Sequence, residues 1–321
     1  MTDREILALR HRVRGSIRRV FDASGYLEVD TPVLSSEILP EPHIDPFELS
    51  LDGPGSTPHS RPASPESLMK RLLAAGSGPI YQFARAFRAG ERGERHDVEF
   101  VLLEWYAPGT SLDDTAAFLA TLCREAIGGV LAADGRVGGI ERVTCRDAFR
   151  EHAGVDPLDA PLEAMREAGM RAGLRLPESH PEHWDAWFEL LLSEAVSPRL
   201  GHARPTMLEA WPASQGALAR LDPADARVAR RFELFVKGVE LANGWEEETS
   251  RSGLVARIEA ANRIRSADGR GPLPMPEKLV AAHGDAMPAG VGAALGFDRL
   301  VMLAAGADTI DAVRCFSSRT A

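Results

Sequence analysis

Apolar residues recur every three or four positions from Ile6 to Phe21, and mostly polar residues fill the positions between them. This spacing predicts an amphipathic helix, and Gly25 predicts its end, because glycine readily takes the left-handed conformation that terminates helices. Residues 26–34 are rich in strand-forming side chains and predict an extended segment. Pro32 cannot donate a backbone hydrogen bond, which places this strand at a sheet edge or at a bulge.

The pattern changes at residues 40–62, which are rich in Pro, Gly and Ser and predict a loop. A helix is expected to begin at Ser64, whose hydroxyl would cap it, and to have Pro65 at its first position. Gly76 predicts the end of this helix.

Residues 80–88 and 98–106 predict two strands, and the polar residues 89–97 between them predict the loop of a long β-hairpin. Residues from about 112 to 195 are rich in Ala and Leu with helical periodicity and irregular Pro breaks. This stretch predicts a helical insertion into a single catalytic domain that spans residues 1–321.

Extended structure is expected again at residues 206–211 and 231–243. Read as one strand, the second segment would place Leu234, Val236, Gly238 and Glu240 on one face. The last third predicts a helix near 253–266, a Pro-rich loop at 271–276, a short helix, a Gly-rich strand at 290–296 and a final helix from Phe297. Strands of the second half would return to pair with earlier ones, so we expect an α+β fold with a mainly antiparallel sheet flanked by helices.

Composition narrows the functional classes. The 321 residues are 44% hydrophobic and 26% charged, as in an ordinary globular chain, and 47 acidic residues against 37 basic ones give a net charge of −10. Without a long Lys/Arg run, this balance disfavours binding to nucleic-acid backbones. Cys123, Cys145 and Cys315 are too few and too far apart for a disulfide framework, which indicates a reducing, cytoplasmic compartment. No segment has the pattern of a secretion signal or of a membrane span.

Three familiar motifs are set aside. Residues 290–296 approach a dinucleotide fingerprint, but the glycines are spaced by one residue too many and lie late in the chain. A phosphate-binding loop of the Gly-Lys-Ser/Thr type does not occur, so bound ATP would contact side chains and sheet. His180 and His183 are separated by Pro181, which favours a loop before a helix over a metal site.

Three segments remain, and their order along the chain is informative. They are a helix and strand ending in Pro32, a strand-loop-strand around Arg88, and a Gly-rich strand leading into a helix with Arg299. They resemble the signature motifs of class II aminoacyl-tRNA synthetases, and residues 63–73 and 99–106 resemble the lysyl branch. That resemblance implies a class II catalytic core. Because the chain begins only one helix before the first motif, we expect no anticodon-binding domain.

Trp105 and residues 212–215, 237–244 and 293–296 resemble a stand-alone group of lysyl-tRNA synthetase relatives, the ligases that attach (R)-β-lysine to elongation factor P. The resemblance implies that β-lysine is activated with ATP and Mg²⁺ as an adenylate. The acyl group is then transferred to the side-chain amine of a lysine on elongation factor P. It also implies a homodimer and no charging of tRNA.

The same resemblance assigns the groups that handle the nucleotide. Attack of a carboxylate on the α-phosphate brings two anions together, so cations are needed where charge builds up. Arg88 would hold the α-phosphate and the carboxylate, Arg299 the triphosphate tail, and Glu240 the Mg²⁺ ion. Further nucleotide contacts are expected from Ala89, Gly90, Asp97, Leu241 and Gly296.

A substrate with two ammonium groups needs two anionic anchors. Glu66 with Ser64 would bind the amine near the carboxyl group, and Glu104, Glu247 and the hydroxyl of Tyr106 would surround the terminal ammonium. Each charge-assisted bond would contribute roughly 1.5–3 kcal/mol.

Ala294 stands where lysyl-tRNA synthetases have glycine. One methyl group on a pocket wall changes preference by about 1–3 kcal/mol, so Ala294 is expected to disfavour α-lysine relative to β-lysine. Ordinary packing is the alternative for this residue.

The chain departs from the family pattern after Arg88, where Ala89, Gly90 and Glu91 replace the usual Asn-Glu, and Asp97 replaces Asn. Glu91 is a candidate to replace the missing acid. Two other functions are therefore kept open: an adenylating ligase with a different acceptor amine, and an inactive synthetase-like protein that regulates a partner.

Overall fold

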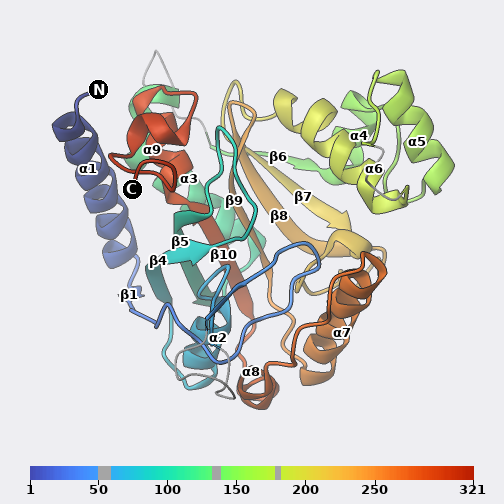
Figure 1. Cartoon of the computed structure of the whole chain (residues 1–321), viewed down its shortest axis with the longest axis horizontal. Coiled ribbons are helices and arrows are strands. Elements are labelled where there is room, and N and C mark those ends of the chain that lie inside the picture. Colours follow the sequence, from blue (N-terminus) through green and yellow to red (C-terminus); the bar gives the residue numbers. More distant parts are fainter. Residues whose placement is uncertain (50–58, 132–138, 178–181) are drawn as a thin grey trace.

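The computed structural model describes residues 1–49, 59–131, 139–177 and 182–321. Within these residues an eight-stranded sheet forms the centre of the molecule (Figure 1). In spatial order its strands are β1 (Leu27–Glu28), β4 (Ile80–Phe87), β5 (Glu99–Pro108), β10 (Gly290–Gly296), β9 (Val239–Glu246), β8 (Val228–Val236), β7 (Thr206–Pro212) and β6 (Glu141–Thr144). The pairs β1–β4 and β6–β7 are parallel and the others are antiparallel, which confirms the expected α+β architecture.

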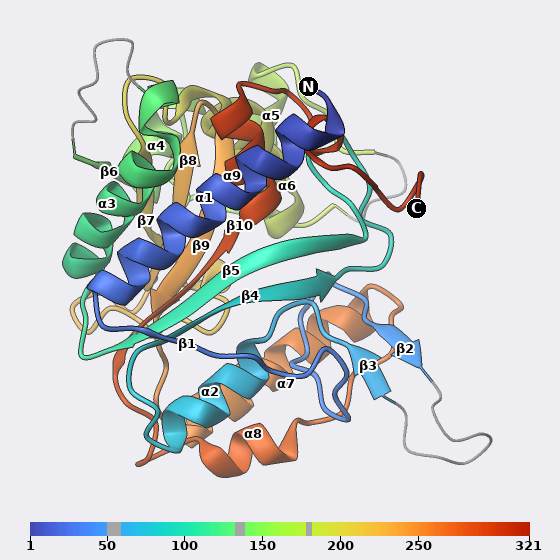
Figure 2. The same ribbon diagram turned by 90° about the vertical axis from the view of Figure 1, so that its left-hand side faces the viewer.

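Three helices cover one side of β4 and β5: α1 (Asp3–Ala23), α3 (Leu112–Leu131) and α9 (Phe297–Ala305) (Figure 2). The predicted apolar stripe of α1 is buried in this layer, and the ring of Phe21 stacks on that of Tyr81 at 4.3 Å between centroids. Gly25 follows α1 with φ 78°, the conformation that ends helices. None of the helices in the described ranges is both long and apolar enough to span a membrane.

The opposite side of these strands carries α2 (Glu66–Ala74), α7 (Arg251–Ala267) and α8 (Glu277–Ala282) (Figure 2). Met69 of α2 belongs to a buried cluster with Tyr106 of β5. The Ser64 hydroxyl accepts a hydrogen bond from the amide of Glu66 at 2.9 Å, as expected for a helix start. Pro65 immediately precedes the helix instead of opening it.

A separate apolar cluster joins α4 (Cys145–His152), α5 (Leu162–Arg171) and α6 (Trp184–Leu191) to β7 and β8. A π-helical segment (Leu192–Val196) and 3-10 turns at Ser197–Arg199, Ala213–Gln215 and Ile310–Val313 complete the helical elements. His183 caps α6 by accepting from the amide of Ala186 at 3.1 Å, in agreement with a loop before a helix. His180 and Pro181 lie outside the described residues.

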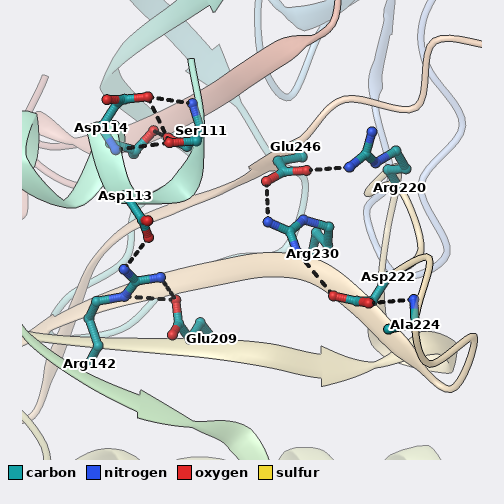
Figure 3. A network of polar contacts seen from close by, with 11 residues as sticks. Ser111, Asp113, Asp114, Arg142, Glu209, Arg220, Asp222, Ala224, Arg230 and Glu246 are labelled. Atoms are coloured by element: carbon teal, nitrogen blue, oxygen red, sulfur yellow. Dashed lines mark hydrogen bonds and ion pairs between the residues drawn. The ribbon is translucent and has the colours of Figure 1, made fainter. Parts of the chain in front are cut away.

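The expected helical insertion is interrupted. Glu141–Thr144 form β6, because these residues pair in parallel with β7, and four residues between helices are too few to show a strand pattern. Arg142 of β6 also binds Glu209 of β7 at 2.7 Å and contacts Asp113 of α3 (Figure 3). Helix α3 packs against α1 and α9, so it belongs to the main layer.

Two strand predictions and one loop prediction are corrected. Residues 231–243 are not one strand, because Lys237 and Gly238 have φ 51° and 72° and reverse the chain between β8 and β9. Glu240 therefore lies on the second arm of a hairpin, opposite Phe235. The strand expected at 26–34 is limited to two residues at the sheet edge. The loop expected at 40–62 contains an antiparallel pair, β2 (Phe47–Leu49) and β3 (His59–Arg61).

Candidate active site

A cavity of about 580 Å³ lies over β5, β10 and β9. Strand β10 forms the floor of the cavity, and the side chains that it directs there are small. Gly292, Ala294 and Gly296 alternate with Val291 and Leu295, which are buried in the main core. A Cβ at Gly292 would lie 2.3 Å from Oε1 of a neighbouring carboxylate, that of Glu247. The glycine therefore allows the side chains of Glu247 and Tyr106 to approach this strand closely.

One end of the cavity is acidic. Glu104 and Tyr106 lie two residues apart on β5, and the Tyr106 hydroxyl donates to Glu104 Oε1 at 2.7 Å. Glu247 follows β9, and Trp245 Nε1 donates to its Oε2 at 3.2 Å. The other carboxylate oxygens, Glu104 Oε2 and Glu247 Oε1, are buried and accept no hydrogen bond from the described residues. Two unsatisfied acceptors in one wall suit an ammonium donor.

Burial shapes the ionisation of this wall. It raises the pKa of Glu104 to about 8, and the negative charge of Glu66 contributes in the same direction. It also raises the pKa of Glu247 to about 7, while the positive charge of Lys70 opposes the change. A bound ammonium would therefore favour the ionised forms of Glu104 and Glu247, because a carboxylate accepts a hydrogen bond better than a protonated carboxyl group does.

Lys70 is one of the residues that sequence reasoning missed. Its side chain is 1% exposed, and Nζ lies 2.6 Å from Glu66 Oε1 and 2.7 Å from Glu247 Oε2. The pKa of Lys70 is raised above its ordinary value, because the two carboxylates outweigh the opposing effect of burial. The available signal was the spacing of Glu66 and Lys70 by one helical turn, with Lys70 directly after the buried Met69.

Glu246, the acid next to Glu247 in the chain, points away from the cavity. Glu246 accepts from Arg230 Nη2 at 2.6 Å and pairs with Arg220 at 3.0 Å, and Arg230 also binds Asp222 at 3.0 Å (Figure 3). This network fixes the end of β9. Because side chains alternate along a strand, it helps to orient Glu247 toward the cavity.

The other end of the cavity is cationic. Arg299, in the first turn of α9, donates to the backbone oxygen of Glu240 at 2.9 Å and to its Oε2 at 3.2 Å. Its Nη2 lies 2.6 Å from His96 Nε2. Burial and the positive charge of Arg299 lower the pKa of His96, so the neutral ring can accept this bond.

Arg88 is less constrained. Its Nη1 lies 3.6 Å from Glu91 Oε1, and its Cζ lies 5.1 Å from the centre of the Phe100 ring. The buried Nε donates to no partner in the described part of the chain. A guanidinium with an open buried donor is suited to an anionic ligand.

A second acid accompanies Glu240. Glu233 of β8 is buried, which raises its pKa to about 8, and the negative charge of Glu240 adds to the effect. Arg231 pairs with Glu233 at 2.5 Å. Carboxylate oxygens are ligands that Mg²⁺ prefers, and a bound cation would reduce the repulsion between these two acids. The described residues contain no cluster of three or more metal-ligating acids, His or Cys.

Most of the predicted residues meet here. The cavity is lined by Ser64, Glu66, Arg88, Gly90, Asp97, Glu104, Tyr106, Glu240, Leu241, Ala294, Gly296 and Arg299. Glu247 and Ala89 are not among the lining residues. Glu247 Oε1 lies beside Gly292, and the amide of Ala89 donates to the backbone oxygen of Asp45 at 3.1 Å. The Asp97 carboxylate accepts from Arg314 at 2.9 Å and from the amide of Ser318 at 2.9 Å, so it anchors the C-terminal segment. Its contact with the nucleotide stays a prediction.

Residues 2–320 match the family of class II tRNA synthetases of the D, K and N type. The chain is 39% identical over 314 residues to the elongation factor P–(R)-β-lysine ligase of Edwardsiella ictaluri, covering 97% of this chain and 94% of that one. The ligase of the same name from Klebsiella pneumoniae (strain 342) is 38% identical over 317 residues, with 97% and 94% covered. That from Vibrio cholerae is 39% identical over 307 residues, with 94% and 91% covered. The chain therefore belongs to the class II tRNA synthetase family and, within it, to the elongation factor P–(R)-β-lysine ligases.

Proposed function

We propose that this protein activates (R)-β-lysine with ATP and transfers it to the side-chain amine of a lysine on elongation factor P. The observation that carries the proposal is the division of one cavity into two parts. The unsatisfied oxygen of Glu104 lines one end, that of Glu247 lies beside Gly292 of the floor, and Arg88 and Arg299 line the other end. A diamine with one carboxylate matches this distribution of charge, and the names of the relatives agree with it.

In the first step the substrate carboxylate attacks the α-phosphate, and pyrophosphate leaves. The open donors of Arg88 would hold the reacting carboxylate and phosphate together and stabilise the charge that develops on them. Arg299 would give up its bond to the Glu240 side chain and bind the triphosphate tail. The small side chains of β10 would let the nucleotide lie flat on the sheet. Glu240 with Glu233 would hold Mg²⁺, which supplies positive charge to the phosphate oxygens.

Recognition of the amino acid would use the acidic end. Glu104, Glu247 and Tyr106 would bind the terminal ammonium, and Glu66 with Ser64 the amine near the carboxyl group. The methyl group of Ala294 would narrow the floor beside the α-carbon and favour the β-isomer. We further propose a cytoplasmic homodimer that charges no tRNA.

Amino-acid-dependent exchange of labelled pyrophosphate into ATP tests the first step without an acceptor. Parallel reactions would contain β-lysine, α-lysine or no amino acid. The proposal expects exchange that favours β-lysine, followed by a mass increase of elongation factor P by one β-lysyl group. Exchange without that mass increase would point to a different acceptor amine. An absence of exchange with both isomers would favour the regulatory alternative.

A further inference from the structure

The transfer step needs a proton acceptor near Arg88. The side-chain amine of a lysine in water has a pKa of about 10.4, so the incoming amine arrives as an ammonium at neutral pH. Its nitrogen can attack the acyl carbon only after it loses a proton. The group that takes this proton must lie within hydrogen-bond reach of the amine, directly or through one water.

Most carboxylates that line the cavity are already engaged by a side chain of the protein. The pairs are Glu66 with Lys70, Glu91 with Arg88, Asp97 with Arg314, Glu104 with Tyr106, Glu240 with Arg299 and Asp298 with Arg10. Glu41 differs from all of them. Among the residues that the structure describes, no side chain forms a hydrogen bond or an ion pair with the Glu41 carboxylate.

The backbone of Glu41 is held by a buried arginine, Arg265. Glu41 lies in the segment between β1 and β2 and lines the cavity together with Ser64 and Arg88. Arg265 of α7, which is 3% exposed, donates from Nη1 to the backbone oxygens of Glu41 at 3.2 Å and Ile44 at 2.8 Å. Its Nη2 donates to Asp45 Oδ1 at 2.8 Å. The backbone is therefore held while the carboxylate stays available.

The surroundings adjust the ionisation of this carboxylate. Burial raises the pKa of Glu41 to about 7, the nearby charge of Arg88 lowers it, and Glu66 and Glu91 add to the increase. Roughly half of such groups are ionised at pH 7. A base whose pKa lies near the working pH is the most effective proton acceptor.

We infer that Glu41 accepts the proton of the acceptor lysine in the transfer step, an inference that rests on the proposed function. The ammonium gives one proton to the Glu41 carboxylate, and the neutral nitrogen forms a C–N bond to the acyl carbon. The C–O bond to the phosphate breaks, and AMP leaves with the electron pair. The second proton lost by the nitrogen goes to the phosphate or to solvent, which leaves a neutral amide.

Glu41→Gln tests this role, because glutamine keeps the shape of the side chain and cannot accept the proton. Pyrophosphate exchange with β-lysine should remain at the wild-type rate, which also shows that the variant is folded. Single-turnover transfer from the preformed adenylate to elongation factor P should fall roughly 10²–10⁴-fold, the range of general-base effects. In the wild type the transfer rate should rise with pH through about 7, and the variant should lack this step.

Hydroxylamine provides the decisive comparison. It is uncharged at pH 7 and needs no base before attack, so the adenylate should be captured as the hydroxamate equally fast by both proteins. Glu48→Gln, which changes an exposed acid on β2, is the matched control and should transfer normally.

Normal transfer by Glu41→Gln would overturn the inference and leave the phosphate or water as the base. A raised KM for β-lysine in the exchange reaction would instead make Glu41 a substrate anchor, which also overturns it. Failure of the wild type to catalyse exchange would refute the proposed function itself, an outcome distinct from both.

Discussion

Replacing Glu104 by glutamine should stabilise the free protein while it impairs substrate binding. The carboxylate is 2% exposed, one of its oxygens has no hydrogen-bond donor among the described residues, and burial raises its pKa from 4.5 to about 8. The folded state therefore binds a proton more tightly at this site than the unfolded state does. Stability from this group is complete below pH 4.5 and is lost as the pH rises through 8.

The size of the effect follows from the displacement of the pKa. Each pH unit between 4.5 and 8 should cost the wild type about 1.4 kcal/mol relative to Glu104→Gln, on the order of 5 kcal/mol in total. The two proteins should be equally stable near pH 4.5. Their difference should then grow with pH and level off above pH 8. Glutamine retains an oxygen for the Tyr106 hydroxyl, so this bond does not confound the comparison.

Urea unfolding of the substrate-free proteins at intervals from pH 4.5 to 9 would measure the difference. Glu99→Gln on the same strand, with a side chain that is 42% exposed, controls for the general effect of changing an acid to an amide. The KM for β-lysine should rise roughly 10- to 200-fold in Glu104→Gln, which corresponds to the 1.5–3 kcal/mol of one charge-assisted bond. A stability difference that did not vary with pH would refute the reasoning.

Lys70→Met should lower the free energy of unfolding by about 3–5 kcal/mol, because it leaves Glu66 and Glu247 buried without their cation. Chemical denaturation at pH 8 measures the loss, and an unchanged free energy of unfolding would contradict the assigned ion pairs. Gly292→Ala should raise the KM for β-lysine and leave that for ATP unchanged, since the new Cβ would lie 2.3 Å from Glu247 Oε1; exchange kinetics with each substrate varied in turn separate the two effects. Ala294→Gly should raise kcat/KM for α-lysine relative to β-lysine by roughly 10- to 200-fold in the exchange assay, and a constant ratio would assign Ala294 to packing alone.

Local sequence patterns were sufficient to predict those elements whose structure depends only on their own residues. The helical spacing that ends before Gly25 gave α1, and the small residues of 290–296 gave β10. Arg88 and Arg299 were found because each follows an apolar strand, whereas Arg92 and Arg95, which also line the cavity, were not predicted. Lys237 and Gly238 were misread, since alternation of apolar residues continues through a two-residue turn and hides the reversal.

Other features depend on residues distant in the chain. Lys70 is charged and would be placed at the surface by composition, yet it is buried because Glu247, which directly follows β9, approaches it from a distant part of the chain. The short strand β6 exists only through its pairing with β7. Glu41 lies in a segment without periodicity, and its place at the cavity is set by a helix that comes much later in the sequence.

The guanidinium of Arg265 also has an entropic consequence. Ordering a backbone residue costs about 1–2 kcal/mol, so fixing residues 41–45 would cost roughly 5–10 kcal/mol if it had to occur in each catalytic cycle. Because Arg265 holds this segment in the folded protein, that ordering occurs once, during folding. The wall of the cavity is thereby preorganised, and its rigidity depends on the docking of α7. Substitutions in that helix can therefore alter the reaction rate through the freedom of a loop, without touching a substrate.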